Sequence, residues 1–311
     1  MINLIRNENM KIYKRKRNWI LIGIVVLFTL IQFVNLKSSG STVVGEDWRN
    51  QLEQEIAFLK LEMNEPDALP IELKQAQISI LLNQYHLDTD LPPSTNTWSF
   101  AVDQAGNLMV AVSFISVIIA GEIVAAEFIG GTIKLLLTRS ASRTKIYISK
   151  YMACLLFGLA LLSIGAVISV VLGGVVLGFQ GLGSSYLYVQ NGVVEQTTII
   201  QALFEAYVLQ IPFLLLTVTL AFMISAAFKS STFSIVISLL VAVAGFVIAT
   251  AMNGWGWTKY FVFSHTNLTQ YALGDPSVTG MSFGFSAVFI LLHLIVMHLV
   301  SYPAFVKRDV V

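Results

Sequence analysis

The stretch Gly121–Lys150, GEIVAAEFIGGTIKLLLTRSASRTKIYISK, decides the fold because it separates two long apolar runs. Two carboxylates, Glu122 and Glu127, stand where the first run ends. The Gly-Gly pair that closes at Gly131 has no Cβ atoms, so the chain can turn there at little steric cost. Thr132 can then cap a new helix by accepting a backbone N–H bond. The sequence therefore predicts a break and a restart between two helices.

The second half of this stretch is basic and partly amphipathic. An apolar row, Ile133 and Leu135–Leu137, lies among five cations: Lys134, Arg139, Arg143, Lys145 and Lys150. A membrane protein concentrates Lys and Arg in its cytoplasmic loops. The pattern predicts a basic, structured knob on that side of a membrane, and an ordinary charged loop is the alternative.

The composition indicates that most of the chain lies in lipid. Of its 311 residues, 56% are hydrophobic and 12% are charged, whereas soluble domains carry about 25% charged residues. The net charge is +1, so bulk charge gives no reason to expect a nucleic-acid partner. The single cysteine, Cys154, excludes a disulfide within the chain.

The apolar runs predict six spanning helices and an all-α polytopic membrane protein. Each run is long enough, at 1.5 Å per residue, to cross a hydrocarbon core of about 30 Å. The predicted spans are Trp19–Leu36, Leu108–Ala126, Tyr151–Leu177, Ala202–Phe228, Phe233–Met252 and Phe283–Val300.

The positive residues predict the orientation of these spans. Segments on the N-terminal side carry fourteen Lys and Arg, against five on the opposite side. The excess marks the cytoplasmic side. We therefore expect a plasma-membrane protein with both termini in the cytoplasm, including a tail at 301–311.

The first segment, 1–18, predicts an interfacial helix. Leu4, Ile5 and Ile12 supply an apolar side. A basic side suited to an anionic leaflet comes from cations that include Lys11, Arg15 and Arg17. A charge cluster without a helix of its own is the alternative.

Three further segments are predicted on the outer side. Segment 37–107 has eleven acidic and four basic residues and two apolar repeats at spacings of three and four, which predicts an acidic helical hairpin. We expect it to act as a spacer or as a substrate-binding domain. In 178–201 the Asn191-Gly192 pair allows a two-stranded tip or an irregular loop. Segment 253–282 is rich in aromatics, as at a headgroup layer.

Enzyme chemistry has little support in the residues. Gly178–Gly183 lacks the Lys-Ser/Thr end of a phosphate-binding loop, so ATP hydrolysis by this chain is not expected. His293 and His298 are five apart and lie on different helix faces, which makes a two-His metal site poor. An intramembrane hydrolase is the remaining enzyme alternative, and no metal ligands are assigned.

Two residues of the fourth predicted span suggest a transport pathway. Glu205 lies one turn inside its outer end, where a charge either faces a cavity or reaches the aqueous edge. Pro212, seven residues later, is expected to kink the helix.

The central stretch also resembles a known family. The order Glu127-x3-Gly131-Thr132, then Ile-Lys-Leu-Leu-Leu and a polar Ser/Arg segment ending at Lys150, resembles permease subunits of ABC-2 type transporters. It is most similar to the bacitracin-export and antimicrobial-peptide-immunity permeases of Gram-positive bacteria. Glu8 followed by Lys11 matches their N-terminal helix. The resemblance implies that the following residues couple the membrane helices to an ATPase subunit: Glu127, Gly131, Thr132, Lys134, Arg139, Arg143 and Lys150.

The resemblance implies the rest of the assembly as well. We expect two copies of a separate ABC ATPase, which would hold ATP and Mg²⁺, and no cofactor in this chain. A second permease, either identical or a sister chain, would complete the path for an amphipathic compound or an antimicrobial peptide. Membrane lipids are the other partner. A membrane sensor without transport is the non-transport alternative.

Overall fold

The computed structural model describes residues 1–38, 47–65, 70–93, 95–129, 142–228, 230–252, 254–276, 278 and 280–306. Most of them are helical. The elements are α1 (Ile2–Lys14), α2 (Lys16–Ser38), α3 (Trp48–Glu62), α4 (Pro70–Thr89), α5 (Thr97–Ile123), α6 (Ala125–Ile129), α8 (Arg143–Leu177), β1 (Ser185–Gln190), β2 (Val193–Thr198), α9 (Ile199–Val208), α10 (Ile211–Ala227), α11 (Ser231–Ala251), η1 (Gly256–Tyr260), η2 (Val262–His265), η3 (Leu268–Tyr271) and α12 (Phe283–Val306).

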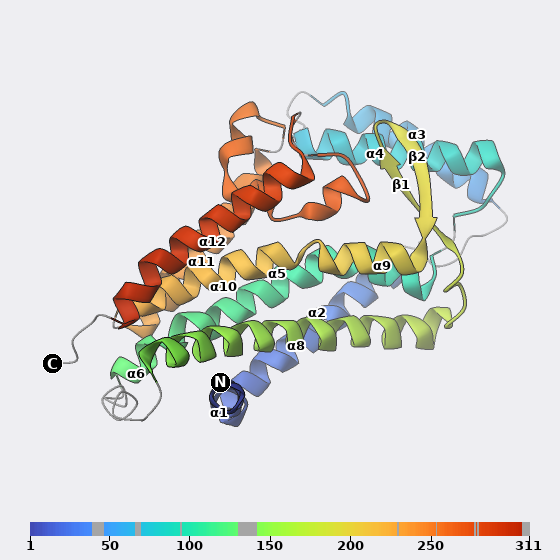
Figure 1. The fold of residues 1–311 in the computed structure, drawn as a ribbon. Coiled ribbons are helices and arrows are strands. Elements are labelled where there is room, and N and C mark those ends of the chain that lie inside the picture. The colour runs from blue at the N-terminus through green and yellow to red at the C-terminus, as the bar shows by residue number, and fades with distance from the viewer. Residues whose placement is uncertain are drawn as a thin grey trace.

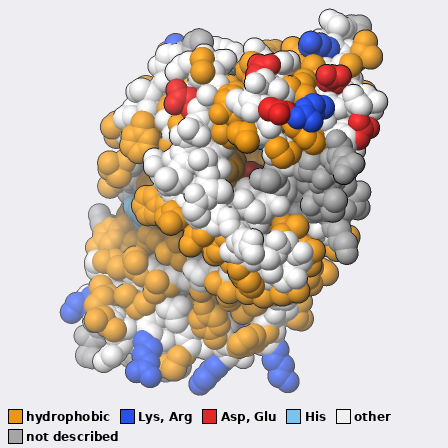
Figure 2. All heavy atoms as spheres, turned by 90° about the vertical axis from the view of Figure 1, so that its right-hand side faces the viewer, with side chains coloured by type: hydrophobic (Ala, Val, Ile, Leu, Met, Phe, Trp, Pro, Cys, Tyr) orange, Lys and Arg blue, Asp and Glu red, His pale blue; other side chains and the backbone are white. Residues whose placement is uncertain are grey.

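The long helices lie side by side in one slanted bundle (Figure 1). One end of the bundle carries α1, α6, the start of α8 and the end of α12, and we name it the basic end. The other end carries α3, α4 and the β1–β2 hairpin, and we name it the acidic end. In Figure 2 acidic side chains gather in the upper part, Lys and Arg project along the lower edge, and hydrophobic side chains fill the belt between.

Within the residues that the structure describes, six helical segments are long and apolar enough to cross a membrane, as the sequence predicts. They are Lys16–Asn35, Thr97–Glu127, Arg143–Leu177, Ile199–Ala227, Ser231–Ala251 and Phe283–Val306. The second and fourth are 67% buried over their most apolar windows, whereas the last is 11% buried. Helices α5 and α10 therefore form the centre, and α12 leaves most of its surface for lipid or for another chain.

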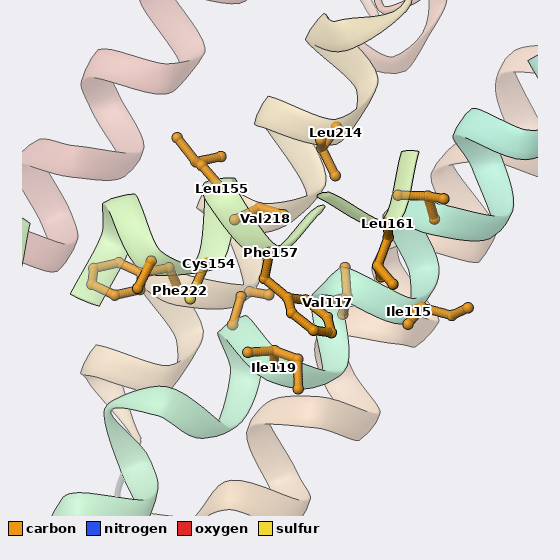
Figure 3. Packing of buried hydrophobic residues seen from close by; sticks show 14 of the residues in the cluster. Ile115, Val117, Ile119, Cys154, Leu155, Phe157, Leu161, Leu214, Val218 and Phe222 are labelled. Carbon is orange, nitrogen blue, oxygen red and sulfur yellow. The ribbon is translucent and has the colours of Figure 1, made fainter. Parts of the chain in front are cut away.

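The core is built where α8 crosses α5 and α10 (Figure 3). Phe157 and Leu161 of α8 interdigitate with residues such as Val117 and Leu214. The backbones approach closely because α8 carries Gly165, where a Cβ atom would lie 2.5 Å from Leu108 Cδ1. A small residue at such a crossing is typical of helices packed in membranes.

The fourth predicted span is interrupted, because α9 ends at Val208 and α10 begins at Ile211. Pro212 stands in the first turn of α10, where its missing N–H breaks the hydrogen-bond ladder. The N–H of Phe213 bonds to Gln210 O at 3.0 Å, so the carbonyl of Leu209 has no helical donor and accepts a bond of 3.0 Å from the backbone N–H of Leu268. The kink predicted at Pro212 is therefore a full break between α9 and α10. The carbonyl of Leu209, exposed at this break, holds the first residue of η3, Leu268.

Several helices are longer than the predicted apolar runs. α5 begins at Thr97 rather than Leu108, because the side chain of Asn96 accepts from Ser99 N and Ser99 Oγ bonds back to Asn96 N. Likewise α8 begins at Arg143 rather than Tyr151, capped by the Ser142 hydroxyl, and α12 continues past Val300 to Val306. Hydropathy marks the apolar part of a helix, whereas capping groups mark its ends.

The described residues outside the spans also form regular elements. Helices α3 and α4 pack against each other. Segment 178–201 adopts the two-stranded alternative, with Asn191 and Gly192 at positive φ between β1 and β2. The rest of the described chain is mostly helical, which agrees with the predicted all-α polytopic class. The aromatic segment 253–282 holds three short 3₁₀ helices, η1–η3.

Candidate functional site: an ion-pair cluster at the basic end

Helix α1 packs across α8 at the basic end and turns sharply into α2. The turn is held by side chains of α2, since Asn18 Nδ2 donates to Ile12 O at 2.7 Å and Trp19 Nε1 donates to Tyr13 O at 2.9 Å. Within α1, Ile12 and Glu8 are buried one turn apart. A buried carboxylate in a helix rich in Lys and Arg requires a specific partner.

Lys150 is that partner. It lies in the third turn of α8, is 0% exposed, and donates from Nζ to Glu8 Oε2 at 2.8 Å. The same ammonium donates to Glu127 Oε1 of α6 at 2.9 Å. One buried cation thus joins three helices that are far apart in the sequence.

Lys11 closes the arrangement into a ring of alternating charges. Its Nζ lies 2.9 Å from Glu8 Oε1 and 3.0 Å from Glu127 Oε1. Burial alone would lower the pKa of Lys11, but the hydrogen bonds and the charges of Glu8 and Glu127 outweigh it and raise that pKa. We name the four residues Glu8, Lys11, Glu127 and Lys150 the ion-pair cluster.

The cluster is balanced, with two carboxylates and two ammonium groups. Its interior side is closed, since the side chains of Lys150 and Glu8 are 1% and 6% exposed, while that of Lys11 is 43% exposed. Breaking a buried pair by removing one partner costs about 3–5 kcal/mol, because the remaining charge is then buried without its counter-ion. The cluster therefore fixes the position of α1 on α6 and α8.

A second set of contacts holds the junction between α5 and α6. Arg15, which lies between α1 and α2, and Arg17, in the first turn of α2, both pair with the carboxylate of Glu122. The backbone N–H groups of Val124 and Ala125 donate to Ser225 Oγ of α10, at 3.2 and 3.1 Å. These N–H groups belong to the break after α5, and Ser225 satisfies them.

The start of α8 is also tied to the end of α12. Arg143 Nη1 donates to Val306 O at 2.7 Å, and the hydroxyls of Thr144 and Tyr302 lie 2.8 Å apart. A cation at a helix C-terminus is favoured by the carbonyl groups that point out of it. The basic end therefore links α1, α6, α8, α10 and α12 through polar contacts.

The structure brings together six of the residues predicted from the sequence: Lys11, Arg15, Arg17, Glu127, Arg143 and Lys150. The predicted coupling residues Gly131, Thr132, Lys134 and Arg139 lie outside the described residues. We expected Glu127 to bind Lys134 or Arg143, and its described partners are Lys11 and Lys150. Lys11, expected on a lipid surface, is in the cluster.

The two pathway residues lie away from this cluster. Glu205 is in α9 near the β1–β2 hairpin, is partly exposed, and accepts from Gln201 Nε2 at 3.0 Å. Pro212 lies at the break between α9 and α10. Neither contacts the ion-pair cluster, because the length of α10 separates them from the basic end.

Sequence reasoning missed two contributors, the pairing of Glu8 with Lys150 and the capping by Ser225. Glu8 did carry a signal, since it stands four residues before Ile12 and so shares the apolar face of α1. Ser225 carries no local signal, because its two partners are 101 and 100 residues away in the chain.

Comparison with known proteins gives one family and two relatives. The family described as "Protein of unknown function (DUF2705)" matches residues 75–311. The uncharacterized protein YhcI of Bacillus subtilis is 36% identical over all of this chain and 99% of its own length. The uncharacterized membrane protein YdbK of the same organism is 26% identical over 66% of this chain and 80% of its own length. No solved structure matches.

Proposed function

We propose that this chain, which belongs to the DUF2705 family, is the membrane-spanning permease subunit of an ABC-2 type exporter. It would move an amphipathic compound or an antimicrobial peptide with ATP hydrolysed by a separate subunit. The observation that carries the proposal is the ion-pair cluster, which binds both flanks of the predicted coupling segment to each other and to α1.

The cluster supports a mechanical role. The chain leaves α6 just after Glu127 and returns in α8 seven residues before Lys150, and these two side chains are joined at 2.9 Å. A force on residues 130–141 would therefore reach α5 and α8 together rather than bend one flank. Because α1 is held by the same charges, it would move with them. Coupling by a rigid unit needs this kind of stiffness.

The proposed contact with the ATPase uses the basic residues of the coupling segment. Lys134 and Arg139 would meet carboxylates on the partner, in contacts worth about 1.5–3 kcal/mol each. The ATPase subunits would hold ATP and Mg²⁺, and the permease would supply the path. Glu205 and Pro212 would shape that path near the acidic end.

The proposed orientation places the basic end in the cytoplasm of a bacterial cell. The Lys and Arg along that end support it through the positive-inside rule. Two ATPase copies would bind there, and a second permease, identical or a sister chain, would complete the membrane part. The exposed cations of α1 would contact anionic lipid headgroups.

The test is to reconstitute the chain with a candidate ABC ATPase subunit from the same organism and to measure ATP-dependent transport into inverted vesicles. Glu127→Ala combined with Gly131→Leu should leave the ATPase bound and its turnover at or below the basal rate, while export is lost. Glu53→Ala, the same chemical change at the acidic end, should export normally because Glu53 lies on an exposed part of α3.

If the double variant exports at the wild-type rate with the complex intact, residues 130–141 are only a charged loop and do not couple the permease to the ATPase. A wild-type chain that binds no ATPase and drives no export would exclude the exporter. If deleting the chain then alters gene expression in response to membrane-active peptides, the sensor is the correct assignment.

A further inference from the structure

We propose that a polar face on α2 and α5 binds the cationic group of an amphipathic cargo. It comprises Gln32 of α2 and Asp103, Gln104 and Asn107 of α5, and we name these four residues the polar face. The inference deepens the proposed function, on which it rests, by naming where the path contacts its cargo and which chemical group it contacts there.

The polar face lies within two of the membrane-spanning segments. Asp103 and Asn107 follow the first residue of their span, Thr97, by six and ten positions, which at 1.5 Å per residue is about 9 and 15 Å along α5. They share one side of the helix because they are four residues apart, and both are exposed. Helix α5 is otherwise central, 67% buried over its most apolar window. An ionisable group in a spanning helix usually faces a cavity or a partner rather than lipid.

Side-chain hydrogen bonds connect the polar face to the acidic end. Gln104 Oε1 accepts from Gln32 Nε2 at 2.9 Å and from Asn107 Nδ2 at 3.3 Å. Asp103 Oδ1 accepts from Tyr186 Oη of β1 at 2.8 Å. In Figure 1 the hairpin that carries Tyr186 lies at the end of the bundle where α5 begins. The polar face therefore runs from the aqueous edge at Asp103 to Asn107, one turn deeper in the span.

Two other exposed polar side chains in the spans bond to their own helix. Ser163 Oγ donates to Leu159 O at 2.9 Å, and Thr250 Oγ1 donates to Phe246 O at 2.9 Å. Such hydroxyls are satisfied locally and can face lipid. The polar face instead joins amide groups side chain to side chain, and each amide has more donors and acceptors than one such bond uses. It therefore suits water or a polar ligand rather than acyl chains.

The charge of the polar face selects a cation. Among the described residues no Lys or Arg pairs with Asp103, whose bonded partner is the uncharged hydroxyl of Tyr186. The hairpin itself, 185–198, holds Glu195 and no Lys or Arg. Carboxylate and amide oxygens accept hydrogen bonds from an ammonium or a guanidinium group, and the bond to a carboxylate is the stronger one. A surface of one sign also raises the local concentration of the opposite charge.

Apolar side chains continue the same side of α5 toward the basic end. Val110, Phe114 and Ile118 follow Asn107 at spacings of three and four, and each is half-buried. An amphipathic cargo can therefore place its cationic group at Asp103 and its apolar part on this row. An anionic compound would be repelled, and an uncharged apolar one would gain nothing from the carboxylate.

The first test asks whether water reaches Asn107. The full chain with Cys154→Ala is placed in phosphatidylcholine nanodiscs, and a single cysteine is introduced by Asn107→Cys or, as the lipid-facing control, by Val167→Cys. Val167 is 61% exposed and lies ten residues inside its span from the acidic end, as Asn107 does, so the depths match. The probes are methanethiosulfonates that carry either a cationic trimethylammonium or an anionic sulfonate group. We expect Asn107→Cys to react about tenfold faster or more, because the reactive thiolate is disfavoured in apolar surroundings.

The second test asks whether Asp103 selects the charge of the probe. The rate ratio of the cationic to the anionic probe at Asn107→Cys is divided by the same ratio for free cysteine, at low ionic strength. Asp103→Asn should lower this value about three- to tenfold, because a carboxylate one turn away attracts one probe and repels the other. Tyr186→Phe removes the bond and keeps the charge, and Glu53→Gln removes a charge from an exposed part of α3, so both should change it by less than about twofold.

The third test asks whether a cationic amphipath occupies the polar face. Decyltrimethylammonium, added below its micelle concentration, should slow the reaction of Asn107→Cys with uncharged N-ethylmaleimide, and Asp103→Asn should remove this protection. Decyl sulfate has the same apolar chain and the opposite charge, so it is the ligand control and should not protect.

Equal labelling of Asn107→Cys and Val167→Cys would overturn the proposal, since the polar face would then lie in lipid. A charge preference that Asp103→Asn leaves unchanged would overturn it as well. A disulfide between two copies at Asn107→Cys, with no labelling by either probe, would show that a second copy covers the polar face instead. Because the tests need no ATPase, the expected labelling without ATP-dependent export refutes the exporter alone, and export with the polar face unlabelled refutes this site alone.

Discussion

Replacing Lys150 with methionine is expected to release α1 from α8. The Lys150 ammonium is buried and holds Glu8 at 2.8 Å and Glu127 at 2.9 Å. Methionine has a similar shape but no charge, so the Glu8 carboxylate would keep Lys11 as its described partner while its side chain remains 6% exposed. Loss of one member of a buried ion pair costs about 3–5 kcal/mol.

The release can be measured as the labelling rate of a cysteine placed at Ile12, which is 5% exposed and faces α8. Cys154→Ala removes the native thiol. A maleimide reacts with the buried position only when α1 opens. The free energy lost with the Lys150 ammonium should therefore accelerate labelling by about two to three orders of magnitude, at 1.4 kcal/mol per tenfold change. Lys145→Met, an exposed cation of the same helix, is the control and should label like the wild type.

The reasoning fails if Lys150→Met labels no faster than the wild type. A double variant, Glu8→Leu with Lys150→Met, supplies a second test. Because it removes both charges of the pair, it should cost less than the sum of the single changes, by about 1–3 kcal/mol. The 2.8 Å separation of Glu8 and Lys150 indicates that the two side chains interact. Strict additivity of the two single changes would mean that they do not.

Three further outcomes are expected. Burial lowers the pKa of His265, so the folded ring resists protonation that the unfolded chain accepts near pH 6.5. The protection factors of the amides in η2, corrected for the intrinsic exchange rate at each pH, should therefore fall below about pH 6.5, and His265→Asn should flatten that dependence. Gly165→Ala should lower the Tm, at a cost of about 1–3 kcal/mol, since its Cβ would meet the buried Leu108. Gly23→Ala, with nothing within 4 Å, should not lower it. Glu205→Gln should reduce export at normal expression; unchanged flux would mean that the carboxylate only reaches the aqueous edge.

The spans were predictable because they depend on local properties. A run of about 20 apolar residues must leave water, and a helix satisfies its own backbone groups in lipid. The break at Pro212 and the hairpin at Asn191-Gly192 follow from single residues that restrict the backbone. Starts of helices were predicted too late at Leu108 and Tyr151, because polar turns continue the helix beyond the apolar part.

The sequence by itself determined that the chain has six apolar helices, a basic end and an acidic end, because hydropathy and charge are summed along contiguous residues. Only the tertiary structure decided which charges meet. Fourteen cations were assigned to one side, and nothing local distinguishes Lys150 from the others as the partner of Glu8, 142 residues away. The crossing of α1 over α8 places that single ammonium out of water, and burial turns an ordinary lysine into the residue on which the junction depends.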